Sequence, residues 1–436
     1  MENGVLFAAL GAEHSLGPPA DLCRLDWGYL LAAAGTQGVA PLLARWLEPG
    51  HDGVPDDVAG RLTAAYWASH FRNRTLLHQL RLVLAAASQV GIPVMPLKGA
   101  ALATRYYPTP ALRPMSDLDL LVHPPDLPRM AALLRGLGYT AVPRPPSLLD
   151  DEDPAVAEYA YVAMAVGMRV LIEYRAEPLD PAIGALHAAD TAMAGRLRAH
   201  TQRMWDRAVP GSLDGAPCAQ ISAEDLLLHV ASHLTTRHAG LRLLWLHDLR
   251  LIAARDRGAL DWDDIVAEAR ALNLARPTHA ALAAAGRWLA APIPAEPLER
   301  LRATEGTRCP LREIGEGHLL MARVAALSAA DLTAESQLQW QQLAIGAGRL
   351  TTMRALLRAA RRTIVPGRTY MAWWYGGSVG LPSEYRRAVG FRIAYVSLSA
   401  LDGAAIRLRL QGLARLTGRM IGRMKSMTPY DCSRNA

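Results

Sequence analysis

Hydrophobic and polar residues alternate along one short segment in the first third of the chain. Residues 115–122 read Met-Ser-Asp-Leu-Asp-Leu-Leu-Val. Because successive side chains of a strand point to opposite faces, this pattern predicts a strand that buries Leu118 and Leu120 on one face. The other face then carries Asp117 and Asp119 side by side. Two carboxylates this close repel each other unless a cation lies between them, and Mg²⁺ is commonly held by one or two carboxylates together with substrate phosphates.

The segment just upstream predicts a site for phosphate groups. Residues 92–97, Ile-Pro-Val-Met-Pro-Leu, have the pattern of a short buried strand. This strand leads through Lys98, Gly99 and Ala100 into a helix that we expect over 101–107. A small-residue turn at the start of a helix presents backbone N–H groups that suit phosphate oxygens. Lys98 adds a positive charge to the same turn.

A hairpin downstream supplies a third candidate carboxylate. Residues 162–166 and 169–174 are two apolar runs separated by a glycine-containing turn, which predicts two paired strands. The second strand would carry Glu173 to a position beside the aspartate strand. Three carboxylates and a phosphate-binding turn are the components of two-metal phosphoryl or nucleotidyl transfer, in which one metal activates the attacking oxygen and the other stabilises the leaving pyrophosphate.

The remainder of the chain has mainly the 3.6-residue period of helices. A long amphipathic helix is expected over 64–89. Its predicted buried stripe consists of Trp67, Phe71, Leu76, Leu80 and Leu84. The fold class is therefore α+β and predominantly helical, with a small mixed sheet and flanking helical regions. The four regions expected are an N-terminal helical region at 1–90, the α/β core at 91–185, a helical domain at 186–330 and a basic helical region at 331–436.

Composition limits the class of protein without naming a function. A chain of 436 residues with 51% apolar and 20% charged residues suits two or three packed domains and argues against disorder. Only Lys98 and Lys425 are lysine among 47 basic residues, a bias that suggests a GC-rich bacterial genome. The four cysteines are far apart, as in a reducing compartment. We find no signal peptide and no apolar stretch of transmembrane length, so a cytoplasmic protein is expected.

The C-terminal region differs from the rest of the chain in charge. Residues 351–430 contain fourteen Arg or Lys against only Glu384 and Asp402, so their net charge is +12. Three interpretations remain open: a helical domain packed on the core, a surface for nucleic acid or another phosphorylated ligand, and an amphipathic helix that binds an anionic membrane or a partner. No RNA-binding signature decides among them.

His229 and His233 also allow more than one interpretation. Ser222 precedes an apolar run and predicts the N-terminal cap of a helix. His229 and His233 lie four residues apart on this helix and therefore share one face. No Glu stands beside the first histidine, so the pair does not match the zinc-protease helix. A metal site remains an alternative, but a role in lining the active site or in stabilising the structure is favoured.

Two motifs together resemble a known family. Residues 97–99, Leu-Lys-Gly, are followed at 113–122 by Arg-Pro-Met-Ser-Asp-Leu-Asp-Leu-Leu-Val. This combination resembles the uncharacterised nucleotidyltransferase family of the DNA-polymerase-β-like superfamily. The resemblance extends over residues 60–290 and implies a polymerase-β-like core. Two positions depart from the superfamily pattern. Ala100 stands where Ser is usual, and Tyr-Arg at 174–175 replaces the His-Trp pair that often follows the third acidic residue.

The resemblance implies a role for each site residue. Asp117, Asp119 and Glu173 would hold two Mg²⁺ ions, for which Mn²⁺ can substitute. Glu173 would complete the second metal site or act as base toward the acceptor hydroxyl. The residues expected to bind the nucleotide are Lys98, Gly99, Ala100, Arg113 and Ser116. For Arg113, a plain salt bridge is the competing interpretation.

The implied reaction moves a nucleoside monophosphate from an NTP, with ATP as the expected nucleotide, to an acceptor hydroxyl with release of pyrophosphate. A small molecule or a protein or peptide side chain is favoured as acceptor, and an RNA 3′ end is a further alternative. The competing function is a catalytically inactive nucleotidyltransferase-fold protein that binds a ligand or acts in a toxin–antitoxin-like pair.

Overall fold

The computed structural model describes residues 2–11, 22–47, 53–142, 159–179, 191–236 and 242–302, together with position 386. The described residues up to 302 belong to one compact unit. The basic region predicted at 331–436 lies outside the described residues except for position 386. The four predicted region boundaries therefore stay predictions.

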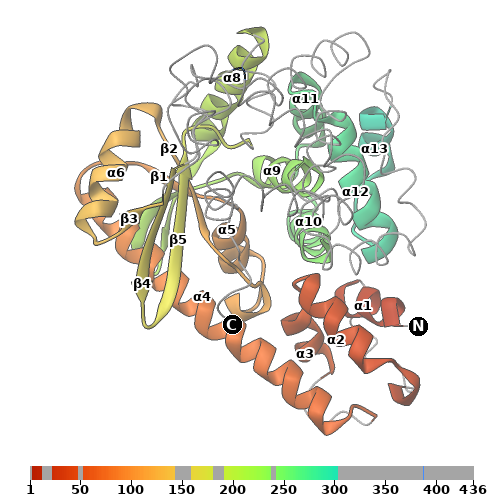
Figure 1. Ribbon diagram of the computed structural model, residues 1–436. Coiled ribbons are helices and arrows are strands. Elements are labelled where there is room, and N and C mark those ends of the chain that lie inside the picture. The colour runs from red at the N-terminus through yellow and green to blue at the C-terminus, as the bar shows by residue number, and fades with distance from the viewer. Residues whose placement is uncertain are drawn as a thin grey trace. The chain divides into compact units, whose positions relative to one another are not determined.

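A five-stranded mixed sheet forms the β part of the unit (Figure 1). Its strands are β1 (Val94–Pro96), β2 (Leu118–Val122), β3 (Thr140–Ala141), β4 (Tyr159–Ala165) and β5 (Met168–Arg175). They lie in the order β1-β2-β5-β4-β3. Strand β2 pairs antiparallel with β1 and parallel with β5, and β4 pairs antiparallel with β5. The predicted hairpin and its position beside the aspartate strand are thus confirmed.

Helices precede, interrupt and follow this sheet. The helices before it are α1 (Glu2–Leu10), α2 (Trp27–Thr36), α3 (Ala40–Leu47) and α4 (Asp56–Gln89). The helices between its strands are α5 (Lys98–Arg105) and α6 (Leu127–Gly136). The helices after it are α8 (Thr191–Arg207), α9 (Ala223–Thr236), α10 (Leu243–Arg255), α11 (Trp262–Ala271), α12 (Ala275–Leu289) and α13 (Ala295–Arg302). A two-stranded sheet consists of β6 (Val209–Leu213) and β7 (Ala216–Gln220). The predicted class, α+β and predominantly helical, is confirmed.

Helix α4 connects the N-terminal helices with the sheet. It has 34 residues and is therefore about 50 Å long at 1.5 Å per residue. It packs against α3 and, toward its other end, against β5 and α6 (Figure 1). It begins eight residues earlier than the predicted start at residue 64, because Asp56 and Asp57 in the first turn favour a helix N-terminus.

The buried stripe of α4 is only partly the predicted one. Three predicted positions are buried, namely Leu76, Leu80 and Leu84. Trp67 and Phe71, however, are 49% and 62% exposed, so their predicted burial is wrong. Ser69 and Asn73 are buried instead. The reason is that polar side chains can face the interior when backbone carbonyls accept their hydrogen bonds, as both of these do.

The two faces of β2 belong to different hydrophobic clusters. Leu118, Leu120 and Val122 pack with residues of α4 and α6. Leu121, on the opposite face, packs with residues of α5, α9 and α10. Because side chains two apart share a face, Asp119 points to the same side as Leu121. The predicted burial of Leu118 and Leu120 is confirmed, and the aspartate lies on the side of the sheet that meets the later helices.

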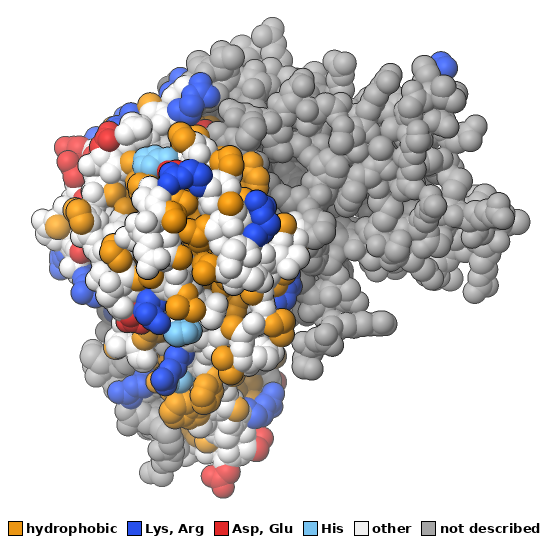
Figure 2. Space-filling model, turned by 90° about the vertical axis from the view of Figure 1, so that its left-hand side faces the viewer, with side chains coloured by type: hydrophobic (Ala, Val, Ile, Leu, Met, Phe, Trp, Pro, Cys, Tyr) orange, Lys and Arg blue, Asp and Glu red, His pale blue; other side chains and the backbone are white. Residues whose placement is uncertain are grey.

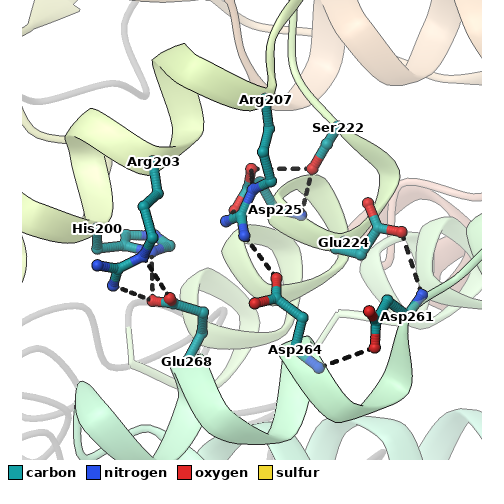
Figure 3. A network of polar contacts seen from close by, with 9 residues as sticks. All are labelled: His200, Arg203, Arg207, Ser222, Glu224, Asp225, Asp261, Asp264 and Glu268. Atoms are coloured by element: carbon teal, nitrogen blue, oxygen red, sulfur yellow. Dashed lines mark hydrogen bonds and ion pairs between the residues drawn. The ribbon is translucent and has the colours of Figure 1, made fainter.

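Arg207 at the end of α8 joins this helix to α9 and α11 (Figure 3). Its guanidinium donates two hydrogen bonds to Asp225, the longer of them 3.1 Å, and one to Asp264 at 2.5 Å. Ser222 donates to the Asp225 carboxylate at 2.9 Å and accepts from its backbone N–H at 3.1 Å. This last bond confirms the predicted N-terminal cap of α9.

Glu268 of α11 is a further carboxylate between α8 and α11 (Figure 3). Arg203 of α8 binds it through two hydrogen bonds of 2.6 and 2.8 Å. His200, one turn earlier on α8, lies with its Nδ1 2.9 Å from Glu268 Oε2, the oxygen that also accepts from Arg203 Nη2. Helices α8 and α11 are thus held together by matched ionic groups.

The surface of the unit is mixed in character. On the face shown in Figure 2, hydrophobic side chains are interspersed with Lys, Arg and His, and acidic side chains lie mostly near its margin. Within the described residues, no helix has the length and apolar character needed to cross a membrane.

Candidate active site

The predicted carboxylates lie at the start of β2, between β1 and β5. Asp119 is the second residue of the strand and is 5% exposed. Asp117 directly precedes the strand and is partly buried. The exposed Ser116 donates from its hydroxyl to Asp117 Oδ1 at 3.1 Å. In the parallel β2–β5 ladder, Glu173 is the direct partner of Asp119, so both residues belong to the same face of the sheet.

Two cations converge on Asp119. Lys98 donates from Nζ to Asp119 Oδ1 at 2.7 Å, and Arg175 donates from Nη2 to the same oxygen at 3.3 Å. All three side chains are buried. Arg175 comes from the end of β5, two residues after Glu173, and sequence reasoning did not identify it as part of the site. Buried charges are stable only when they are paired, so this cluster holds Lys98 firmly beside the aspartate.

The two aspartates differ in how readily they ionise. Burial and then the negative charge of Asp119 raise the pKa of Asp117. Burial also opposes the ionisation of Asp119, but the charges of Lys98 and Arg175 outweigh it and lower the pKa of that carboxyl. The nearby positive charges are therefore sufficient to offset the burial of Asp119 but not the burial of Asp117. A cation near Asp117 would favour its charged form.

The Lys-Gly turn packs closely against the segment before β2. A Cβ atom at Gly99 would lie 3.0 Å from Arg113 Nη1 and 3.0 Å from Met115 Cγ, so only glycine fits without displacing a neighbour. Lys98 has a φ of +43°, a left-handed conformation that is uncommon for residues other than glycine. Ala100 completes this buried first turn of α5, which no side chain from the described residues caps. Its backbone N–H groups therefore suit an anion.

Arg113 lies close to Gly99 and forms a buried ion pair. Its side chain is 5% exposed and donates from Nη2 to Asp248 Oδ2 at 2.8 Å. Tyr107 donates from its hydroxyl to Asp248 Oδ1 at 2.6 Å, and the guanidinium carbon is 4.9 Å from the ring centroid of Trp245. Of the two roles considered for Arg113, the structure contains the salt bridge, and its contact with phosphate stays a prediction.

Two polar residues of α4 hold the segment that leads into β2. Asn73 donates from Nδ2 to the carbonyls of Pro110 and Arg113 at 2.6 and 2.8 Å. Its Oδ1 accepts from the backbone N–H of Met115 at 3.2 Å, and Ser69 donates to a further carbonyl of the segment at 2.6 Å. Sequence reasoning missed both residues. Their spacing of four, in phase with the leucine stripe of α4, is the signal that marks them as inward-facing.

The carboxylates at the start of β2 fit a magnesium ion that is shared with a substrate. In the part of the chain that the structure describes, no three His, Cys, Asp or Glu side chains are gathered as a complete metal site. Mg²⁺, however, is usually held by one or two carboxylates plus substrate phosphates. Asp117 and Asp119 match this requirement in kind and in position, because both are carboxylates at the start of β2. Burial and the charge of Asp119 raise the pKa of Asp117, and a cation would favour its charged form. A metal-binding role for Glu173 stays a prediction.

The two histidines of α9 stack on each other, and the cations at the site influence His229. The rings of His229 and His233 are nearly parallel with centroids 6.4 Å apart, which confirms their shared face, and His233 packs 4.6 Å from Trp245. Burial, followed by the charges of Lys98 and Arg175, lowers the pKa of His229 to about 3. His229 is therefore a neutral imidazole that lies within the field of the two cations at the site.

The unit combines an α+β fold, two aspartates at the start of an interior strand, a glycine turn at a helix N-terminus and buried cations beside Asp119. This combination is typical of a nucleotidyltransferase domain. A family model described as an uncharacterised nucleotidyltransferase matches residues 24–290, which is more than half of the chain. The chain belongs to this family, as the motifs predicted. Comparisons with curated proteins and with solved structures find no match.

Proposed function

We propose that this protein is a Mg²⁺-dependent nucleotidyltransferase that moves a nucleoside monophosphate from an NTP, with ATP as the expected nucleotide, to an acceptor hydroxyl. The observation that carries the proposal is the unequal pair Asp117 and Asp119. The charges of Lys98 and Arg175 outweigh burial and lower the pKa of Asp119, whereas burial and the charge of Asp119 raise the pKa of Asp117. Family membership supports the general reaction class.

Each residue at the site has a proposed task. Asp117 and Asp119 would hold the metal, with Glu173 as the third carboxylate or as base toward the acceptor. When bound, Mg²⁺ would activate the attacking oxygen and stabilise the leaving pyrophosphate. Lys98 and the first turn of α5 would bind the phosphates. Ser116 would orient Asp117 through the hydrogen bond between their side chains.

The proposed acceptor is a hydroxyl of a small molecule or of a protein or peptide side chain. In-line attack of this oxygen on the α-phosphorus forms the new P–O bond, and the bond to the β-phosphate oxygen breaks to release pyrophosphate. The hydroxyl proton passes to a base, for which Glu173 is the candidate because it lies in register with Asp119 on the same face.

The direct test measures label transfer from each α-phosphate-labelled NTP in the presence of Mg²⁺ or Mn²⁺, with the protein itself and small hydroxyl compounds as acceptors. We expect transfer and pyrophosphate release by the wild type and loss of both in Asp117→Asn. The matched control is Asp263→Asn, because this aspartate on α11 has an 82% exposed side chain and lies outside the site. Equal activity of Asp117→Asn and the wild type would contradict the proposal.

A catalytically inactive binding protein is the second candidate. It is favoured by the lack of a gathered three-ligand metal site within the described residues. This candidate predicts that the wild type binds an NTP without releasing pyrophosphate under any of the conditions above. Measurement of nucleotide binding beside label transfer therefore separates the two functions.

A further inference from the structure

His229 is the unusual histidine of this unit. It is 4% exposed, and neither of its ring nitrogens has a hydrogen-bond partner among the described residues. Buried polar groups in folded proteins are nearly always bonded. Two other buried histidines follow that rule, since His200 Nδ1 lies 2.9 Å from Glu268 and His247 Nδ1 lies 3.0 Å from the carbonyl of Leu10. His229 therefore has a hydrogen-bonding capacity that the described protein does not use.

The position of His229 relates it to the phosphate turn. Helix α9 packs against α5, the helix whose first residue is Lys98. Arg105, the last residue of α5, also donates from Nη1 to the carbonyl of Ile221, two residues before α9, at 2.6 Å. The cations with the strongest influence on the ring are Lys98 and Arg175. The unused imidazole thus lies on a helix that packs against α5 and within the electrostatic influence of the two cations that bind Asp119.

The chemistry of these groups indicates the class of ligand. A neutral imidazole carries one N–H donor and one acceptor nitrogen. Cations and free backbone N–H groups at a helix N-terminus favour an anion with several acceptor oxygens. A phosphate group satisfies the N–H donor of His229 as well as Lys98. A metal ion is a poorer fit, because no set of three metal-ligating side chains exists in the described ranges.

We propose that His229 is a phosphate-binding residue that donates a hydrogen bond from α9 to the β- or γ-phosphate of the bound NTP. This inference rests on the proposed function, because it names a contact within the same nucleotide site. In this arrangement Lys98 and the first turn of α5 bind the pyrophosphate portion from one side, and His229 binds it from the later helices. The contact holds a part of the substrate that leaves the reaction as pyrophosphate.

The test compares the full-length wild type with His229→Leu and His229→Gln. Binding of the four α,β-methylene NTP analogues and the matching monophosphates is measured with Mg²⁺. We expect His229→Leu to weaken binding of the preferred triphosphate analogue by about 10- to 100-fold, as for loss of a hydrogen bond to a charged group. Binding of the monophosphate should change much less. His229→Gln keeps an N–H donor and should recover part of the affinity.

Thermal stability supplies an independent readout. Leucine at position 229 removes two unsatisfied nitrogens, so the Tm of His229→Leu should equal or exceed that of the wild type. The matched control is His200→Leu. This variant loses a bonded histidine and should have a lower Tm with unchanged affinity for the analogue, because His200 belongs to the α8–α11 network and not to the nucleotide site.

Three results would overturn this inference and leave the proposed function intact. These are unchanged affinity of His229→Leu for the analogue, equal losses for triphosphate and monophosphate, and a Tm loss in His229→Leu as large as that in His200→Leu. If the wild type binds none of the four nucleotides, the proposed function fails first and the inference fails with it, so the two failures are distinguishable.

Discussion

Helix α9 contributes side chains to two buried polar clusters, and the clusters differ in how completely their hydrogen-bonding groups are used. At Asp225, Arg207 donates to both carboxylate oxygens and Ser222 donates to one of them (Figure 3). At His229, one turn further along, neither ring nitrogen finds a partner in the described part of the protein. Neighbouring residues therefore satisfy the hydrogen-bonding groups of Asp225, whereas the described residues do not satisfy those of His229.

The carboxylates of the two regions show the same contrast. Burial opposes the ionisation of Glu268, but hydrogen bonds from His200 and Arg203 outweigh it and lower its pKa to about 2. At Asp117, burial and the charge of Asp119 prevail and the pKa is raised. A polar group whose partners are all within the fold stabilises the fold, and a group whose partners are incomplete indicates where a ligand binds.

The largest expected effect is the separation of activity from stability at Asp117. Asp117→Asn should reduce nucleotidyl transfer by about a thousandfold or more, which corresponds to ~4 kcal/mol of transition-state stabilisation. Its thermal stability should be unchanged or slightly higher, because the fold disfavours the charge that the substitution removes. Label transfer and thermal unfolding measured on the same preparation check this. If Asp117→Asn loses activity only because it unfolds, the expected separation of activity from stability is wrong.

A substitution at the ion pair between Asp225 and Arg207 should reduce stability and leave activity unchanged. Asp225→Ala leaves Arg207 without one of its two carboxylates, and we expect a loss of about 2–4 kcal/mol in the free energy of unfolding, as for a broken buried ion pair with one partly exposed partner. Transfer activity per folded molecule should be unchanged. Urea unfolding and label transfer test both parts. Reduced activity at unchanged stability would place Asp225 in the active site instead.

His229 and Glu268 should each change the free energy of unfolding over a different pH range, and His229 should do so at the higher pH. Burial, followed by the charges of Lys98 and Arg175, lowers the folded-state pKa of His229 from 6.5 to about 3. The unfolded state therefore binds the proton first, and stability should fall as the pH drops below 6.5, by on the order of 2–4 kcal/mol. His229→Leu should lack this loss. Equal pH dependence of this variant and the wild type between pH 6.5 and 4.5 would contradict the expectation.

The contribution of Glu268 should appear at lower pH. Its folded-state pKa is lowered from 4.5 to about 2, so its stabilising effect is complete above pH 4.5 and is lost as the pH falls toward 2. We expect up to about 3 kcal/mol. Chemical unfolding across this range should show the loss in the wild type but not in Glu268→Gln. A loss of equal size in both proteins would assign acid sensitivity to other groups.

The smallest expected effect concerns Gly99. In Gly99→Ala the new Cβ would press on Arg113 and Met115, and a loss of about 1 kcal/mol is typical of mild overpacking. Nucleotide affinity should fall because the turn shifts. Gly136→Ala on α6 is the control, since a Cβ there meets no atom within 4 Å in the described residues and alanine favours the helix. Binding and unfolding measurements of both variants check this difference.

Local patterns were sufficient for much of the fold and part of the site. Alternation in 115–122 predicted a strand, which the structure has at Leu118–Val122, and the two apolar runs predicted the hairpin that carries Glu173. Asp117 precedes this strand, so its shared face with Asp119 stays a prediction. The same kind of reasoning failed for Trp67 and Phe71, because hydrophobicity alone decided which side of α4 was expected to be buried. Hydrogen bonds to the segment before β2 bury Ser69 and Asn73 instead, and sequence pattern does not reveal such partners.

The sequence by itself determined the elements and the family, because periodicity, glycine turns and the motif around Asp117 are local properties of the chain. Only the tertiary structure decided which charges are matched. Lys98 and Arg175 are 21 and 56 residues away from Asp119 in sequence, and Arg113 is 135 residues away from Asp248. Burial and hydrogen-bond partners depend on distances that exist only after folding, and these distances leave both ring nitrogens of His229 without a partner among the described residues.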